Sequence, residues 1–563
     1  MIPVNFIRKA WEGLCASDVL MLVFAGAILV LVFLKDIEGP GISYEELDDA
    51  EWTARYLKSE RADYSKLNIF GRSIPVMINN SYTGAMRLYL LFPFLAVFGI
   101  NIFAVRFYGI FMAFWLLFFT WKAVSGWLGR KTALWTLLLM LMHPVFHFYS
   151  KIGTFSEIHL NVMMMMSIYL WLKWKDSGKR GFLYGSFFLI GLGIWAKIVF
   201  VFYAGAFLTG YFLFLKRERI MTRKDWLAGG LAFMVGMGPL IFHNIRERGD
   251  TLKTVLNAAR RPVPQNDTDF VFDNWNISEN FKDRYEQFSR VFGGIDFDTF
   301  QSHGLYRYKG GGIFGPIFLF VVLVLCIRSI LKKERRTFFI LYVFLFMFSG
   351  LCFTLSIYRP SHLFFLVPFF HVVLAGFLVG SFSRSEGLFK KIFIRRISAA
   401  AAAAIMCVIF FHNFKAFRWY LTSPKVPEYL YATPEVSGFV DYLLANGVYR
   451  PLTPDNEPRI RKTVYFLSKL RISPLSPGWP PGKGLDQLSQ IYGKILNRGE
   501  IRDLITYCYP DIPEDDKVSA VNFGALSAAL QKSPYKLILR KEFRDRLNRV
   551  VFRHYGIVED RKR

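Results

Sequence analysis

An acidic cluster follows the first long apolar segment of the chain, which runs from Val19 to Leu34. Five carboxylates fall between residues 45 and 51, in a chain of 563 residues whose formal net charge is +27. A carboxylate that its neighbours hold in place can act as general base toward an acceptor hydroxyl or amine, and Glu45 and Glu46 are the candidates. The alternative is a solvated helix start, because Ser43 is a suitable N-cap with Glu46 three residues later. Both interpretations stay open.

Cations near the predicted ends of apolar segments form a second group. They are Arg72, Arg87, Arg106, Lys151, Lys197, Arg307, Lys309 and Arg359. For most of them, contact with lipid headgroups is the simpler explanation. Lys197 differs because it lies between two apolar segments with little loop to solvate it, while Arg359 and His362 directly precede an apolar run. Cations at such depth usually meet a buried anion, and the phosphate of a lipid carrier is a natural partner for Arg87, Lys197, Arg359 and His362.

Two histidines, His143 and His147, are four residues apart near the end of an apolar segment, with Glu157 and His159 further along. A histidine pair at this spacing can bind a metal such as zinc. The sequence offers no clear third ligand on the same helix face, so aromatic packing is favoured. A divalent metal at this pair is kept as the minor alternative.

The composition indicates which elements must position these residues. The chain is 53% hydrophobic and 18% aromatic, which is far more apolar than a soluble protein of this length. Long apolar runs recur, and basic residues close them. The run lengths exclude an outer-membrane barrel, whose strands would alternate over about ten residues. The sequence therefore predicts a polytopic α-helical membrane protein.

Eleven apolar segments are candidate transmembrane helices. They are residues 18–34, 101–121, 132–149, 157–174, 181–196, 198–215, 226–244, 312–330, 337–355, 361–380 and 397–413. The basic loops between them fall on one side, which the positive-inside rule makes cytoplasmic, together with the N-terminus. The basic loops share one side when Leu88 to Ile100 does not cross the membrane. This short segment contains Pro93 and is interpreted as an interfacial or re-entrant helix. Eleven spans place the C-terminus outside the cytoplasm.

The predicted organisation is a transmembrane module of residues 1–414, with external loops 35–100 and 245–311, and a C-terminal extracytoplasmic domain of residues 415–563. The length and mixed segments of that domain suit one small α/β or α+β fold. Cys508 is its one cysteine, so no disulfide forms within it. No nucleotide-binding glycine motif is present, and no nucleic acid is expected as a partner.

Several segments resemble a known family. Tyr44-Glu45-Glu46 is similar to the Tyr-Asp-Glu motif of the GT-C glycosyltransferases, and Tyr82 to Leu91 resembles their small-residue, basic, apolar surface helix. Phe103 to Phe107, His143 to Lys151, Gly191 to Lys197 and Arg359 to Pro368 are further similarities. Within that superfamily, residues 20–380 most resemble bacterial dolichyl-phosphate-mannose protein mannosyltransferases (glycosyltransferase family 39) and ArnT-like enzymes.

This sequence departs from the family pattern at two acidic positions. The family usually has Asp where this chain has Glu45, which leaves Glu46 and Asp48 as alternative bases. The second acidic position of the family, near Lys151, reads Ile152-Gly153-Thr154 here, and Glu157 is the candidate to replace it. The C-terminal domain matches nothing in the pattern.

The resemblance implies an inverting transferase that takes its sugar from a polyprenyl-phosphate donor outside the cytoplasm, in a bacterial inner membrane. A carboxylate would deprotonate the acceptor, which is a protein or a glycolipid, and Arg87, Lys197, Arg359 and His362 would hold the leaving phosphate. No cofactor is implied with certainty beyond the lipid-linked donor. A lipid-linked glycan transporter or flippase, or a membrane scaffold, remains an alternative, although a transporter should show internal repeats that the sequence lacks.

Overall fold

The computed structural model describes residues 17–33, 37, 44–60, 65–69, 72–78, 82–151, 158–216, 220–260, 277–292, 314–332, 334–352, 360–382, 434–448, 468–469, 494, 502–507, 526, 528–544 and 550–559. The chain divides into two compact units. The first, called here the helical unit, comprises Met1–Ile37, Asp63–Leu90 and Arg106–Trp419. The second unit comprises Glu38–Ala62, Leu91–Val105 and Tyr420–Arg563.

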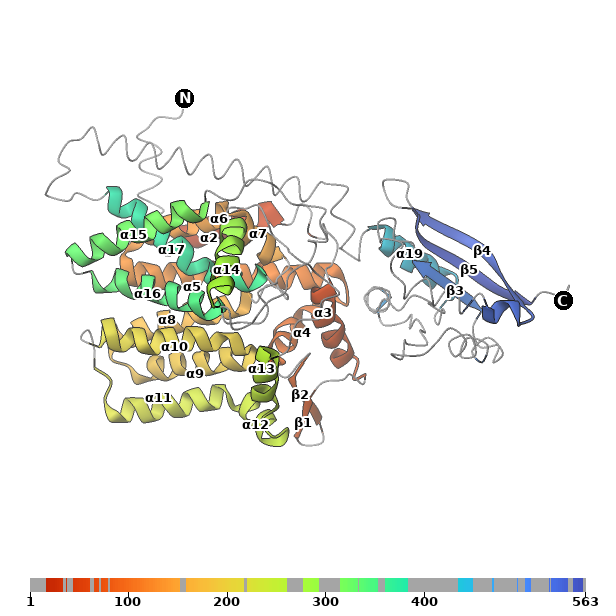
Figure 1. Cartoon of the computed structure of the whole chain (residues 1–563), viewed down its shortest axis with the longest axis horizontal. Coiled ribbons are helices and arrows are strands. Elements are labelled where there is room, and N and C mark those ends of the chain that lie inside the picture. The colour runs from red at the N-terminus through yellow and green to blue at the C-terminus, as the bar shows by residue number, and fades with distance from the viewer. Residues whose placement is uncertain are drawn as a thin grey trace, which may run out of the picture. The chain divides into compact units, whose positions relative to one another are not determined.

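Helices make up most of the helical unit (Figure 1). In chain order they are α2 (Asp18–Phe33), α6 (Arg130–Met142), α7 (Pro144–Lys151), α8 (Ile158–Ser177), α9 (Arg180–Ala196), α10 (Val201–Gly210), α11 (Arg223–Gly236), α12 (Gly238–Arg246), α13 (Asp250–Arg260), α14 (Ile277–Phe292), α15 (Phe314–Lys332), α16 (Arg335–Cys352) and α17 (Val367–Phe382). Short helices η2 (Ile198–Phe200), η3 (Tyr211–Leu215) and η5 (Pro360–Leu366) join some of them. Two more, α4 (Met86–Phe98) and α5 (Ile102–Leu128), continue from one unit into the other.

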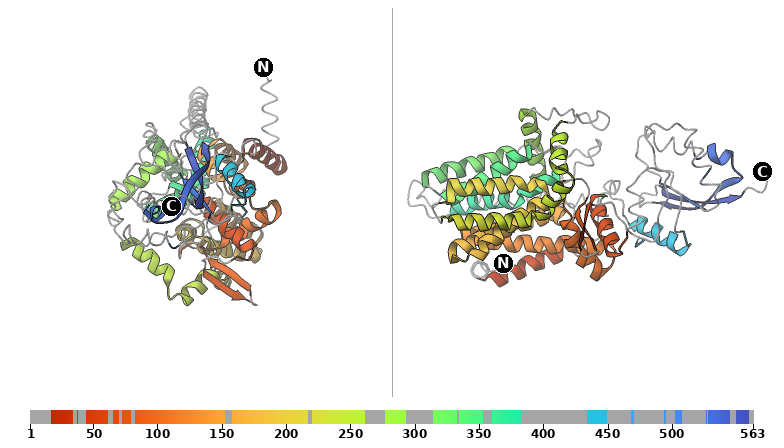
Figure 2. Two further views of the ribbon diagram at one scale, coloured as in Figure 1. Left: turned by 90° about the vertical axis from the view of Figure 1, so that its right-hand side faces the viewer. Right: turned by 90° about the horizontal axis from the view of Figure 1, so that it is seen from below.

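The long helices of this unit run side by side, as both further views confirm (Figure 2). Helix α9 packs against α8 on one side and α11 on the other, while α10 packs against α16 and α6 against α17. Aromatic rings fill the spaces between them. Trp127 stacks on Trp171 and on Phe339, with ring centroids 5.7 and 4.7 Å apart. Ring-on-ring packing of this kind joins α5, α8 and α16 into one core.

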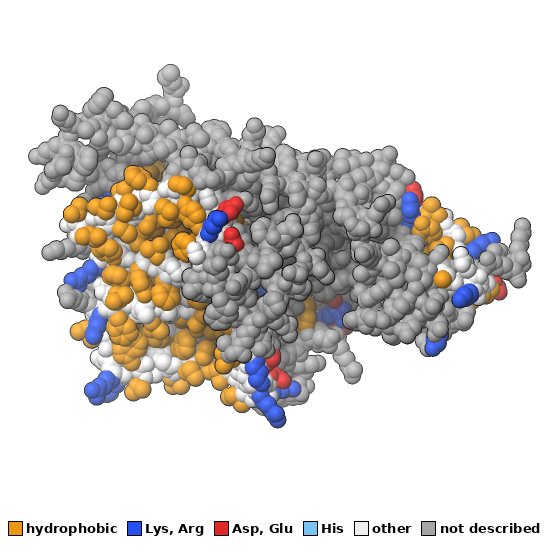
Figure 3. All heavy atoms as spheres, viewed as in Figure 1, with side chains coloured by type: hydrophobic (Ala, Val, Ile, Leu, Met, Phe, Trp, Pro, Cys, Tyr) orange, Lys and Arg blue, Asp and Glu red, His pale blue; other side chains and the backbone are white. Residues whose placement is uncertain are grey.

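The outward surface of the helices is apolar. Figure 3 shows hydrophobic side chains spread over the visible face of the bundle. Leu227 and Leu231 on α11 are 76% and 67% exposed, and Leu323 and Leu331 on α15 are exposed as well. A contiguous apolar surface of this extent is unusual on a soluble monomer and suits contact with lipid tails.

Most of the expected spans coincide with helices. Among the described residues, four helices are long and apolar enough to cross a membrane, or up to six when each of two bent pairs is one span. The bent pairs are α6 with α7, at 75°, and α11 with α12, at 63°. Shorter apolar helices cover Asp18–Val30, Met86–Phe98, Arg180–Ala196 and Phe318–Leu331. The predicted span at 397–413 lies outside the described residues. The structure therefore supports a polytopic helical protein, and the number of eleven spans stays a prediction.

A small hairpin interrupts the helices. Strands β1 (Ser65–Ile69) and β2 (Arg72–Met77) pair antiparallel, with Leu67 opposite Ile74. The chain then returns, because Met77 pairs with Gly84 just before α4 begins. Helix α12 packs against β2. The hairpin thus connects the outer helix pair α11–α12 with the segment that leads into α4.

The second unit contains α3 (Tyr44–Leu57), α19 (Pro434–Ala445) and a three-stranded antiparallel sheet of order β3-β5-β4. The strands are β3 (Asp503–Tyr507), β4 (Tyr535–Arg544) and β5 (Val550–Glu559). Helix α19 packs on β4, where Phe439 meets Phe543. The buried His554 joins helix and sheet, because its Nε2 lies 2.9 Å from Asp503 and its Nδ1 lies 3.2 Å from the Tyr442 hydroxyl.

Candidate functional site

Lys197 lies where two helices meet. Helix α9 ends at Ala196 and η2 begins at Ile198, and Lys197 between them adopts extended backbone angles of φ −160° and ψ 131°. The extended residue pairs antiparallel with Thr83. On either side of this bridge, the Gly84 amide donates to the Ala196 carbonyl and the Ile198 amide donates to the Tyr82 carbonyl, both at 3.1 Å. Lys197 is therefore fixed by main-chain hydrogen bonds and not by a solvated loop, as its position between apolar helices requires.

Gly84 allows the two segments to approach this closely. A Cβ atom on Gly84 would lie 2.2 Å from the Trp195 carbonyl oxygen and 2.8 Å from the Trp195 ring. The Trp195 indole N–H in turn donates to the Val76 carbonyl at 2.9 Å. The paired segments Val76–Ile78, Tyr82–Ala85 and Trp195–Ile198 are called here the Lys197 clamp. Because glycine has no Cβ, it suits this close backbone contact.

His362 completes the Lys197 site from a distant part of the chain. The Lys197 Nζ lies 3.2 Å from the His362 Nε2. An ammonium group can only donate, so this geometry fits a neutral His362 that carries its proton on Nδ1. His362 is buried in η5. The cation and the imidazole thus form one polar site that joins the α9–η2 junction to η5.

Asn161 holds η5 in place. Its side chain on α8 is fully buried, and its Nδ2 donates to the Phe364 carbonyl at 2.9 Å. Phe364 is two residues after His362, in the same short helix. A buried carbonyl that loses such a partner costs about 1–3 kcal/mol. Asn161 is therefore a positioning residue for His362.

Arg87 enters this region in the first turn of α4, three residues after Gly84. The side chain is partly buried. It interacts electrostatically with His159, which is the second residue of α8. Arg87, Lys197 and His362 therefore all belong to the part of the helical unit built around the Lys197 clamp and the start of α8.

The acidic cluster forms α3, which begins at Tyr44 as the Ser43 cap predicts. Glu46 is fully buried, and Asp49 and Glu51 are 3% and 5% exposed. Glu51 forms an ion pair with Arg55 at 2.7 Å. The solvated helix start is therefore wrong for Glu46, Asp49 and Glu51. A buried carboxylate is ionised only when neighbours stabilise it, so burial is consistent with a base that is held in place.

Four predicted residues cannot be placed. Glu157 and Arg359 lie outside the described residues. Glu45 and Asp48 are in α3, but their side chains also lie outside the described part of the structure. Their roles stay predictions.

His143 and His147 lie at the bend between α6 and α7 and are buried. The His143 Nε2 lies 2.9 Å from the Phe292 carbonyl, and the His147 Nε2 contacts the Leu141 carbonyl. The His143 ring packs between Phe292 and Phe370. Within the described residues, no three His, Cys, Asp or Glu side chains come together as a metal site would require. This geometry is that of packed core histidines.

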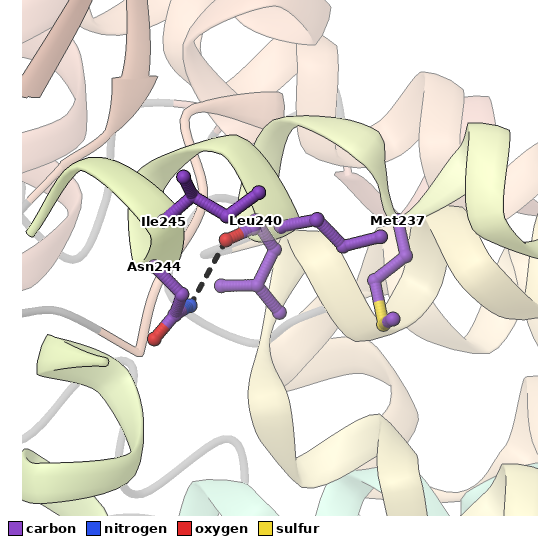
Figure 4. A pocket seen from close by; sticks show the side chains of 5 residues that line it. Met237, Leu240, Asn244 and Ile245 are labelled. Atoms are coloured by element: carbon purple, nitrogen blue, oxygen red, sulfur yellow. Dashed lines mark hydrogen bonds between the residues drawn. The ribbon is translucent and has the colours of Figure 1, made fainter. Parts of the chain in front are cut away.

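An apolar groove of about 370 Å³ lies at the bend between α11 and α12. Met237, Leu240, Ile241, Asn244 and Ile245 line it (Figure 4). The Asn244 side chain donates to the Leu240 carbonyl and to the Thr251 hydroxyl, both at 2.9 Å, so its amide is used in joining α12 to α13. The groove suits hydrocarbon and offers little for chemistry on a phosphate or sugar.

Three features of the site were not predicted from the sequence. Gly84 and the clamp depend on pairing between residues about 110 positions apart, which local patterns do not reveal. Asn161 and His159 stand out only as polar residues in an apolar helix, and that signal is weak. Lys197 and His362 were predicted as separate cations, and the structure brings them together.

One family model matches part of the chain. Residues 84–242 match the family model described as dolichyl-phosphate-mannose-protein mannosyltransferase. That range begins at Gly84 and includes Arg87, His159, Asn161 and Lys197. No curated protein matches the sequence of the chain.

Solved structures of one bacterial enzyme resemble most of the chain. One is ArnT from Cupriavidus metallidurans bound to undecaprenyl phosphate, with a TM-score of 0.57 and 11% identity over 96% of this chain and 98% of that one. This chain has the GT-C fold. The same ArnT in the apo state gives a TM-score of 0.52 at 13% identity, over 95% of this chain and 97% of that one. At this identity the likeness establishes the GT-C fold alone, so the chemistry rests on the residues of the site.

Proposed function

We propose that the chain is an inverting glycosyltransferase that moves a sugar from a polyprenyl-phosphate donor to an acceptor hydroxyl or amine on the extracytoplasmic face of the membrane. The observation that carries the proposal is the Lys197–His362 pair. The clamp holds the Lys197 backbone, and Lys197 lies inside the segment that matches the mannosyltransferase family model. The GT-C fold that the chain shares with an ArnT bound to undecaprenyl phosphate supports the lipid-linked donor.

The cations would stabilise the leaving group. When the bond between the sugar C1 and the phosphate oxygen breaks, the electron pair stays on the phosphate, which gains negative charge. Lys197 is held by the clamp and by His362 before the reaction, so it would stabilise that charge without reorganising, and Arg87 is proposed as the second cation. His362 accepts from Lys197 and thereby orients the ammonium group. Arg359 is proposed to bind the same phosphate, because it precedes His362 by three residues in the sequence.

A carboxylate of α3 is proposed as the general base. Glu45 or Glu46 takes the proton of the acceptor hydroxyl or amine while the acceptor oxygen or nitrogen attacks C1 from the face opposite the phosphate. One displacement of this kind inverts the configuration at C1. Glu157 is the second acidic candidate. No cofactor is proposed beyond the lipid-linked donor, and a divalent metal at His143 and His147 remains the minor alternative.

The proposed setting is a bacterial inner membrane, with the N-terminus in the cytoplasm and the C-terminus outside it. The exposed apolar side chains of α11 and α15 are proposed to contact membrane lipids. The acceptor is proposed to be a protein or a glycolipid that reaches the external face.

The test is a transfer assay on the purified full chain in nanodiscs. Donors are undecaprenyl phosphate linked to a radiolabelled sugar and, in parallel, the matching sugar nucleotide. Transfer or release of sugar from the lipid-linked donor alone supports the proposal, and use of the sugar nucleotide alone contradicts it.

The base is tested in the same assay with Glu45→Gln and Glu46→Gln, and Glu51→Gln serves as the matched control because Glu51 is paired with Arg55. Loss of about 10²-fold or more in one of the first two variants identifies the base. Equal activity of both variants and the wild type would exclude a base at either position.

A further inference from the structure

His159 is a buried histidine without hydrogen bonds. It is 2% exposed, and neither ring nitrogen has a hydrogen-bond partner among the residues that the structure describes. Other buried histidines differ. His143, His147 and His371 each have a ring nitrogen on a backbone carbonyl, and both nitrogens of His554 are bonded. His159 thus differs from these four histidines, because both of its ring nitrogens are without a hydrogen bond in the described part of the structure.

An unpartnered ring is expensive in this position. A buried donor or acceptor that is left unsatisfied costs about 1–3 kcal/mol, and the imidazole has one of each. A phenylalanine would fill the same space at no such cost. Polar groups that are unsatisfied in the free protein are found where a ligand satisfies them, and strain of this kind gathers at functional sites.

The surroundings of His159 indicate which ligand this is. The Arg87 guanidinium acts on the ring electrostatically, so an anion that Arg87 attracts could also accept a hydrogen bond from the ring N–H. His159 is also the second residue of α8, where the positive end of the helix dipole and the first backbone amides favour an anion. Two residues further on, Asn161 holds η5 and therefore His362. His159 and the Lys197–His362 pair are thus connected through the start of one helix.

We propose that His159 binds the donor phosphate, with one ring N–H donating to a phosphate oxygen and the other nitrogen accepting from a hydroxyl of the sugar. The inference rests on the proposed function, because it assigns a further ligand to the same phosphate. It makes His159 a binding residue that contacts the substrate, together with Arg87 and Lys197.

The test measures ligand binding and needs no turnover. The full chain is placed in phosphatidylcholine nanodiscs, and its thermal unfolding and ligand affinity are measured with undecaprenyl phosphate. Undecaprenol, which has the same tail without the phosphate, and phosphatidylglycerol, which carries a lipid headgroup phosphate, are the comparison ligands. The variants are His159→Phe, His159→Gln, Lys197→Met and, as a matched buried histidine, His371→Phe.

The proposal predicts that His159→Phe weakens undecaprenyl phosphate binding about tenfold, while His371→Phe changes it less than about twofold. His159→Gln keeps an N–H donor and should retain most of the affinity. Without ligand, His159→Phe should unfold at the same temperature as the wild type or a higher one, because an unsatisfied polar group has been removed. A ring with a merely structural role would lower that temperature.

Two results would overturn the inference. In the first, His159→Phe binds undecaprenyl phosphate as tightly as the wild type does, while Lys197→Met binds it more weakly. This result would leave the proposed function intact. In the second, His159→Phe weakens binding of undecaprenol or of phosphatidylglycerol as much as it weakens binding of undecaprenyl phosphate. This result would show that His159 does not recognise the donor phosphate. If the wild type itself does not bind undecaprenyl phosphate, the proposed function fails.

Discussion

Gly84→Ala changes the Lys197 clamp by one methyl group. The added Cβ would lie 2.2 Å from the Trp195 carbonyl oxygen, whereas ordinary contacts begin at 3.4 Å, so the paired segments must separate by about 1.2 Å. The Gly84–Ala196 hydrogen bond, now 3.1 Å, would lengthen beyond about 4 Å and be lost. The neighbouring bond from Ile198 to Tyr82 would weaken with it. At about 1 kcal/mol for each bond, the expected loss of stability is about 2 kcal/mol.

The activity should fall further than the stability suggests. Lys197 is the residue that pairs with Thr83 in the clamp, so a shift of the clamp moves its ammonium group away from the phosphate site. A displacement of about 1 Å in a positioned group can cost about 10²-fold in rate. The prediction for Gly84→Ala is therefore a lower unfolding temperature together with a loss of about 10²-fold in kcat/KM for the lipid-linked donor.

The assay combines thermal unfolding in nanodiscs with donor turnover below the unfolding temperature of the variant. Gly230→Ala is the matched control, because a Cβ at Gly230 on α11 would meet nothing within 4 Å and alanine favours a helix. Gly230→Ala should keep wild-type activity and unfold no earlier than the wild type. If Gly84→Ala keeps both full stability and full activity, the clamp does not hold Lys197 as described.

Three further changes have distinct expected outcomes. Asn161→Ala removes the bond to the Phe364 carbonyl and should lower stability by about 1–3 kcal/mol and raise the donor KM severalfold; an unchanged KM would remove Asn161 from the support of His362. His143→Phe should retain transfer activity and lose about 1 kcal/mol of stability, because its Nε2 bonds the Phe292 carbonyl; activity lost with the ring and dependent on added zinc would favour the metal alternative. A spin label at Ile245 or Leu252, both exposed on α12 and α13, should in a bilayer be relaxed by oxygen more than by a water-soluble nickel complex, and the opposite order would place these helices in water.

The membrane class and most helix positions could be predicted from the sequence, because apolar length and basic flanks are local properties. The expected segment 181–196 is found as α9, Arg180–Ala196, and 198–215 is found from η2 through η3. The bends within two of the expected spans were harder to predict from the sequence. The expected spans 132–149 and 226–244 each break into two helices, near His143-Pro144 and Gly236–Gly238. Proline and glycine at those positions were the available signals.

The candidate site was predicted in part. Lys197 stood out because it is a cation without a loop, which is again a local property. Its partner His362 and the clamp residue Gly84 arise from contacts over 165 and about 110 positions, and only the folded chain brings them together. His159 resembles a core residue in the sequence and is recognised only when its two nitrogens are seen without partners. The burial of Asp49 and Glu51 was likewise missed, because a run of carboxylates suggests solvation.

The central claim is that Lys197 stabilises the leaving phosphate of a lipid-linked sugar. The most direct measurement is kcat/KM for undecaprenyl-phosphate-linked sugar with Lys197→Met, compared with Lys224→Met, which changes an exposed lysine on α11. The account predicts a loss of about 10²–10³-fold for Lys197→Met and wild-type activity for Lys224→Met. Wild-type turnover by a folded Lys197→Met protein would contradict it.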